Sequence, residues 1–98
     1  MLTLEEAKTL AIASARDQIE NKTTELVVFD ARTIVKRYGW VLFVNTAALA
    51  RSGDFIMDAL VGLGPIVVRH DGNVHVLSGA TPVEESIADL ERKHWLRP

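Results

Sequence analysis

The chain has 98 residues, of which 48% are hydrophobic, and its formal net charge is −2. That apolar fraction is sufficient for a core and excludes a disordered chain, and the length fits one domain covering residues 1–98. The absence of cysteine excludes disulfides, thiolate catalysis and cysteine-ligated zinc. Both signs of charge are spread along the chain, so it lacks the basic stripe typical of nucleic-acid binding.

The sequence shows no segment that would direct it to a membrane. Its first ten residues, MLTLEEAKTL, carry acidic side chains where a secretory signal needs positive charge. Apolar runs such as Trp40–Val44 are far too short to span a bilayer. We therefore expect a cytoplasmic protein without a membrane partner.

The first predicted element is a helix over about residues 4–20. Thr3 and Glu6 match a capping box, in which each side chain satisfies a free backbone N–H group of the other residue. Small apolar residues then recur at helical spacing, at Ala7, Ala11 and Ala15. This alanine stripe would let the helix lie close to the surface on which it packs.

Two strands are predicted next, over about residues 25–36 and 39–46, joined by a tight turn at Tyr38-Gly39. The second strand would place Trp40, Leu42 and Val44 on one face, and Val41 and Phe43 on the other. Because both faces are apolar, we expect a central strand that is covered on both sides.

Residues 47–64 are predicted to form a loop with one helical turn at about 54–61. A hairpin follows, with strands at about 65–70 and 73–77 around Asp71-Gly72-Asn73, whose residue types tolerate positive φ.

The last predicted element is a helix with Thr81 as its N-cap, Pro82 at its first position and Glu84 completing a capping box. Its apolar face would present Val83, Ile87, Leu90 and His94. The predicted order is α-β-β-loop-β-β-α. The predicted fold class is α+β, with a four-stranded antiparallel sheet flanked by N-terminal and C-terminal helices.

His70 and His75 are the most evident candidates for chemistry. They face each other if the turn is centred on Gly72-Asn73, whereas His75 faces Val68 if it is centred on Asp71-Gly72. Neither arrangement supplies a clear third ligand, and zinc normally takes three or four from the protein. We therefore expect no metal, no cofactor and no catalytic residues. An enzyme that uses both histidines and a carboxylate is a weaker alternative.

The 47–64 segment carries much apolar surface for a connection. Most of it is expected to close one end of the core, and the alternative is that Phe55 and Met57 form a contact patch for another protein. The candidate partner-binding residues are Trp40, Arg51, Asp54, Phe55, Met57 and Asp58.

Several short segments, taken in order, resemble the immunity protein 35 family, which includes the YrhB branch. They are Glu5-Glu6-Ala7, Gly39–Phe43, Ser52-Gly53-Asp54, Gly62–Val68, Asp71–His75 and Thr81–Glu85. The turn after Val68 is one residue shorter than in the YrhB branch, and Arg69 stands where that branch commonly has an acidic residue. Because of these two differences, the resemblance does not imply which residues of this hairpin would contact a partner.

The resemblance implies a bacterial, cytoplasmic, non-catalytic immunity protein. Such a protein binds and neutralises the cognate toxin of a polymorphic toxin system by protein–protein contact. The YrhB branch is described as chaperone-like, so a small holdase or a small-molecule-binding module is the alternative function. A homodimer formed through a sheet edge is left open.

Overall fold

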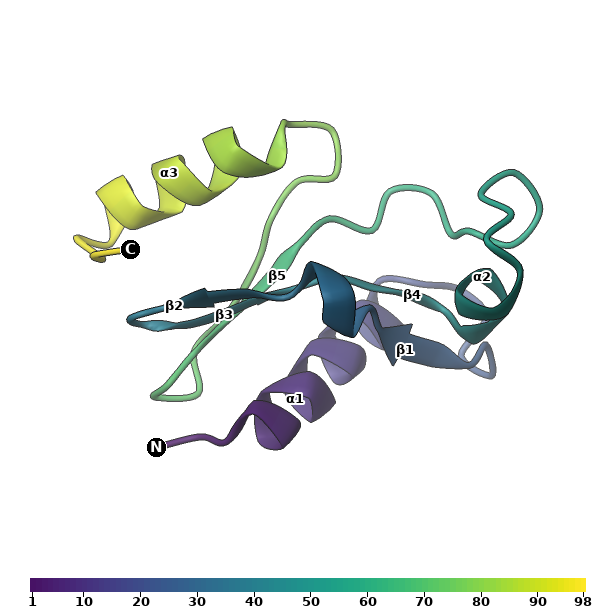
Figure 1. Cartoon of the computed structure of the whole chain (residues 1–98), viewed down its shortest axis with the longest axis horizontal. Coiled ribbons are helices and arrows are strands. Elements are labelled where there is room, and N and C mark those ends of the chain that lie inside the picture. Colours follow the sequence, from purple (N-terminus) through teal and green to yellow (C-terminus); the bar gives the residue numbers. More distant parts are fainter.

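The computed structural model describes all residues from 1 to 98 and shows an α+β fold. A central sheet is covered by one helix on each face (Figure 1). The elements in chain order are α1 (Leu4–Asp17), β1 (Leu26–Val28), the 3-10 turn η1 (Asp30–Arg32), β2 (Ile34–Lys36), β3 (Gly39–Leu42), β4 (Val44–Thr46), α2 (Ala47–Ser52), β5 (Ile66–Arg69), β6 (Val74–Val76) and α3 (Val83–Lys93). None of these helices has both the length and the apolar character needed to cross a bilayer.

The main sheet has four strands in the order β2-β3-β5-β6, and all its neighbours are antiparallel. A separate two-stranded ribbon pairs β1 with β4. The predicted four-stranded antiparallel sheet is therefore confirmed, and the ribbon is an addition to it.

The predicted strands over 25–36 and 39–46 are both wrong as single elements, because the first divides into β1 and β2 and the second into β3 and β4. Val28 pairs with Val44, whereas Ile34 pairs with Val41. Between these two pairs, the β1–β2 side of the hairpin therefore contains three more residues than the β3–β4 side. The 3-10 turn at Asp30–Arg32 accommodates these extra residues. A bulge of this kind bends the hairpin and increases its twist, which separates the ribbon from the main sheet.

Two clusters of buried side chains lie on opposite faces of the sheet. On the α1 side, Trp40, Leu42 and Val44 pack with the fully buried stripe of Ala7, Ala11 and Ala15. On the α3 side, Val41 and Val67 pack with Ile87 and Leu90. The predicted alternation along 39–44 is confirmed, because successive side chains of a strand point to opposite faces.

The predicted capping box at the start of α1 is confirmed. The Thr3 N–H donates to Glu6 Oε1 at 2.9 Å, and the Glu6 N–H donates to Thr3 Oγ1 at 3.2 Å. The helix ends at Asp17 rather than at 20, where the Gln18 N–H already donates to the Ala15 carbonyl in a tighter turn.

The predicted N-cap of the last helix is wrong. Pro82, with ψ of 138°, occupies the N-cap position and makes no side-chain cap hydrogen bond, so α3 begins at Val83. The proline ring fixes only φ, which at −53° would suit a helix, so it is the extended ψ of Pro82 that places the helix boundary one residue past the expected Thr81 cap. Ile87 and Leu90 are buried as predicted.

Candidate functional site

The helical turn predicted at 54–61 is present as a single turn, in which the Asp58 N–H donates to the Asp54 carbonyl. The helix of this segment, α2 at Ala47–Ser52, was not predicted. Thr46 Oγ1 accepts a hydrogen bond from the Leu49 N–H at 2.9 Å and so caps its first turn. Gly53 ends it in a left-handed conformation with φ of 71°, and its N–H donates to the Leu49 carbonyl at 2.8 Å. The Thr46 hydroxyl at the N-cap and Gly53 at the C-cap therefore place the helix before the Gly53-Asp54 turn and not after it.

The chain after Gly53 forms one ordered turn. Asp54 Oδ1 accepts hydrogen bonds from the N–H groups of Ile56 and Met57, both at 3.1 Å, and the Asp58 N–H donates to the Asp54 carbonyl at 2.9 Å. Ser52 Oγ donates to Asp58 Oδ2 and accepts from the Asp54 N–H. These contacts satisfy the polar groups of the turn locally, so its apolar side chains are not needed to hold it.

Asn45 anchors the end of this turn to the β1–β4 ribbon. Its Nδ2 donates to the Leu60 carbonyl at 3.2 Å, and its Oδ1 accepts from the Leu60 N–H at 2.8 Å. Thr46 Oγ1 also donates to the Asp58 carbonyl at 2.5 Å. The segment is therefore fixed to the ribbon by side-chain contacts that imitate a strand pairing.

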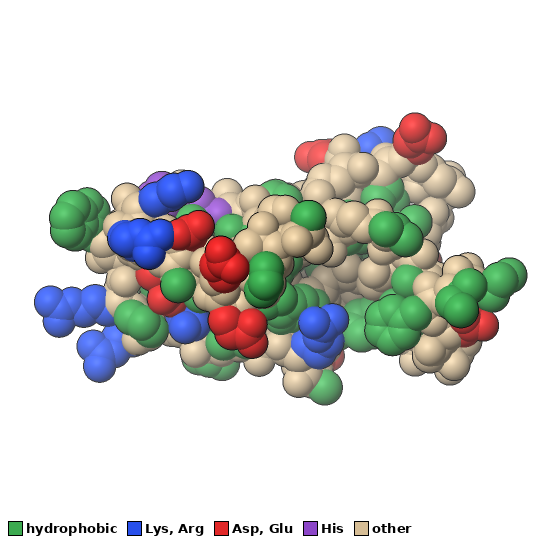
Figure 2. Space-filling view, turned by 90° about the horizontal axis from the view of Figure 1, so that it is seen from above, with side chains coloured by type: hydrophobic (Ala, Val, Ile, Leu, Met, Phe, Trp, Pro, Cys, Tyr) green, Lys and Arg blue, Asp and Glu red, His purple; other side chains and the backbone are tan.

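The apolar residues of 47–64 divide into two sets. Leu49 is buried, and Leu60 and Leu63 pack against the α1-side cluster, so part of the segment closes one end of the core. The expectation that most of it does so is wrong, because the other large apolar residues, Val61 among them, are exposed. Phe55, Ile56 and Met57, which we call the apolar tip, remain 68%, 93% and 77% exposed. Figure 2 shows hydrophobic side chains gathered at this end of the molecule. Three adjacent exposed apolar residues on a fixed turn form a surface suited to contact with another molecule.

Charged side chains border the apolar tip. Arg51 and Asp54 are exposed, Asp58 is half-buried, and Arg51 Nη1 lies 4.0 Å from Glu25 Oε1. The structure thus brings together five of the six residues predicted to bind a partner.

Trp40, the sixth predicted contact, lies elsewhere. Its side chain is only 9% exposed and packs in the α1-side cluster, where its ring centroid is 4.7 Å from that of His70. It therefore has little surface to offer a partner, and we do not include it in the site.

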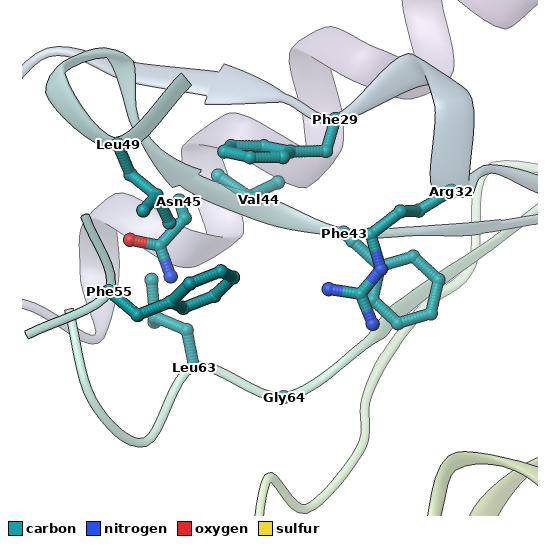
Figure 3. A pocket seen from close by; sticks show the side chains of 9 residues that line it. All are labelled: Phe29, Arg32, Phe43, Val44, Asn45, Leu49, Phe55, Leu63 and Gly64. Atoms are coloured by element: carbon teal, nitrogen blue, oxygen red, sulfur yellow. The ribbon is translucent and has the colours of Figure 1, made fainter. Parts of the chain in front are cut away.

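A small pocket opens beside the apolar tip, between the β1–β4 ribbon and the 53–64 segment (Figure 3). Its volume is about 80 Å³. Its lining includes Phe29, Arg32, Phe43, Leu49, Phe55 and Leu63. The Arg32 guanidinium carbon lies 4.2 Å from the centroid of the Phe43 ring. Sequence reasoning missed this pocket, because the bulge and the folded-back loop create it.

The structure separates the two histidines that sequence analysis considered as a pair. The β5–β6 turn is centred on Asp71, so His75 pairs with Val67, an arrangement that neither expected register gives. His70 lies beside Trp40 on the α1 side, whereas His75 contacts His94 on the α3 side, with ring centroids 4.8 Å apart. No group of three or more His, Asp or Glu side chains is arranged to hold a metal ion.

The environment of His75 lowers its pKa. Burial is the largest cause, and the nearby His94 and Arg69 act in the same direction, against a smaller opposing effect of Asp71. The Nε2 atom of His75 is buried without a hydrogen-bond partner. Burial, the neighbouring His94 and Arg69, and the unpartnered Nε2 atom all favour the neutral imidazole.

Comparison of the chain with models of protein families, with curated proteins and with solved structures finds no match.

Proposed function

We propose that this chain is a non-catalytic immunity protein that binds and neutralises a cognate bacterial polymorphic toxin by protein–protein contact. The sequence resemblance to the immunity protein 35 family motivates the choice of partner. The observation that carries the proposal is the apolar tip, Phe55, Ile56 and Met57, exposed on a turn whose backbone is already hydrogen-bonded.

The apolar tip supports binding on energetic grounds. Burying one such side chain contributes about 1.5–3 kcal/mol, and a few buried apolar anchors dominate the affinity of most protein interfaces. Because the turn is fixed by Asp54 and Asn45, less conformational freedom is lost on binding. Arg51, Asp54 and Asp58 at the border would add selectivity through charge complementarity.

The test is co-expression with each toxin encoded beside the gene. We expect the wild-type chain to restore growth against one toxin and to copurify with it. The double variant F55S/M57S should lose both effects, because removing two exposed apolar contacts weakens the complex by more than about tenfold.

The matched control is V35S, which removes an exposed apolar side chain from β2, away from the tip. It should leave the growth rescue intact. Failure to rescue from every neighbouring toxin would refute the proposal. Suppression of aggregation of many unrelated unfolding proteins, without such rescue, would instead establish the chaperone-like alternative.

A further inference from the structure

All three phenylalanines of the chain line the same pocket, although they come from three separate segments. Phe29 and Phe43 come from the two sides of the hairpin, where the Phe29 N–H donates to the Phe43 carbonyl at 2.8 Å. Phe55 reaches the pocket from the 53–64 segment, and its ring points inward in Figure 3. The bulge and the folded-back loop thus create an aromatic wall without filling the space between the rings.

Arg32 places a positive charge at this wall. Its guanidinium stacks on Phe43 and is turned toward the pocket in Figure 3, and it forms no ion pair or hydrogen bond with the protein. The nearest acid in sequence, Asp30, is engaged by Lys8 Nζ at 2.7 Å, so it does not neutralise Arg32. The stacked guanidinium keeps its N–H groups free to bind an anion.

The pocket offers a ligand few other polar groups. The Asn45 amide, which also lines it, gives one Nδ2 N–H and its Oδ1 to Leu60 and carries no charge. A ligand would therefore meet apolar surface and a single cation. We propose that this pocket binds a small apolar monocarboxylate, with its carboxylate on Arg32 and its hydrocarbon tail between the phenylalanine rings.

The volume limits the size of the tail. At about 80 Å³ the pocket is roughly half as large as an apolar cavity of about 150 Å³ that admits benzene. A short branched tail fits this volume, whereas a long fatty acid does not. The probe of choice is 3-methylbutanoate, which joins an isobutyl group to a carboxylate.

The experiment is a titration of the isotope-labelled full chain with 3-methylbutanoate, followed by amide NMR shifts. We expect saturable shifts at Phe29, Phe43, Phe55 and Leu63, with a Kd on the order of millimolar for so small a ligand. The uncharged 3-methylbutanamide should bind about tenfold more weakly, because it lacks the charge-assisted contact with Arg32. Acetate, which has the charge without the tail, should also bind more weakly.

Variants separate the charge from the apolar wall. R32Q should weaken 3-methylbutanoate binding about tenfold and abolish its advantage over the amide. R37Q, which removes an exposed arginine that does not line the pocket, should bind like the wild type. F55A should weaken binding of the acid and the amide alike.

Equal binding of acid and amide, unchanged binding in R32Q, or no saturable shift at the pocket residues would overturn the proposal. It does not rest on the proposed toxin binding, because the titration uses the isolated chain. A failed growth rescue leaves the outcome of this titration unaffected.

Discussion

The hydroxyl of Tyr38 donates a hydrogen bond of 2.8 Å to Glu91 Oε2, which joins the β2–β3 turn to α3. Lys36 Nζ lies 3.1 Å from the same carboxylate oxygen. Glu91 and Lys36 are both largely shielded from solvent, so these contacts fix the C-terminal half of α3 over the tip of the hairpin. Several of the polar contacts that decide this fold likewise join residues far apart in sequence.

Tyr38 should make the protein sensitive to alkaline pH. Burial, and then the hydrogen bond to Glu91, raise the pKa of Tyr38 above its ordinary value of about 10. The unfolded chain therefore releases this proton first, and stability present below about pH 10 is lost as the pH rises toward the folded-state pKa. Tyr38 is the only tyrosine, so ultraviolet absorbance reads its titration directly.

The Y38F substitution should lower the free energy of unfolding by about 1 kcal/mol at neutral pH. In urea unfolding, this variant should also be destabilised less than the wild type by alkaline pH. An ordinary tyrosine pKa in the folded protein would contradict this account.

His75 should make the protein sensitive to mild acid. Burial and the neighbouring His94 lower its pKa, so the unfolded state binds the proton more readily than the folded state. The stability that depends on neutral His75 is therefore complete above about pH 6.5 and is lost as the pH falls toward the lower folded-state pKa. NMR titration of the imidazole C–H signals gives that pKa. H75Q should show a flatter stability profile between pH 7.5 and 5, and an identical profile would exclude His75 as the cause.

Gly39 is required by close backbone packing. A Cβ atom at this position would lie 2.0 Å from the Val68 carbonyl oxygen and 2.8 Å from the Arg69 Cα. We expect G39A to cost several kcal/mol, since the β3 and β5 backbones would have to separate. At Gly53, which also has positive φ, a Cβ atom meets nothing within 4 Å, and G53A should cost only about 1–2 kcal/mol. The urea unfolding midpoints of the two variants test this order. Equal losses of stability would show that the backbone φ angle, and not the close packing at Gly39, determines the cost of both substitutions.

Asn45 should control the order of the 54–61 segment. N45A removes both hydrogen bonds to Leu60, and we expect a loss of about 1–3 kcal/mol because the Leu60 backbone groups lose their partners. Hydrogen exchange should accelerate at the Leu60 amide and across the preceding turn, while amides of β5 keep their protection. T23A, which removes an exposed hydroxyl, is the control. Unchanged exchange at Leu60 would mean that the local contacts of Asp54 suffice.

Sequence patterns predicted the parts of the fold that depend on neighbouring residues. Thr3 and Glu6 cap α1 as expected, and the alternation from Trp40 to Val44 divides the core between two faces. A signal for α2 was also present, since Thr46 precedes an alanine-rich run that ends at Gly53. A helical turn was predicted at 54–61 instead, because the larger apolar residues lie there.

The candidate site was predictable only in part. Phe55 and Met57 were recognised as surplus apolar residues on a connection, and the structure leaves both exposed. Ile56, the most exposed of the three, carried the same signal and was not named among the candidates. The pocket was not predictable, because Arg32 and Phe55 line the same space only once the 53–64 segment has folded back against the β1–β4 ribbon.

The capping box of α1 and the alternating faces of β3 could be predicted from the amino-acid sequence, because both follow from contacts between residues a few positions apart. Contacts between distant segments instead set the break at Asp30–Arg32, the separation of His70 from His75 and the formation of the phenylalanine pocket. Strand register is a competition between long-range pairings, and shifting it by one residue turns every side chain to the opposite face.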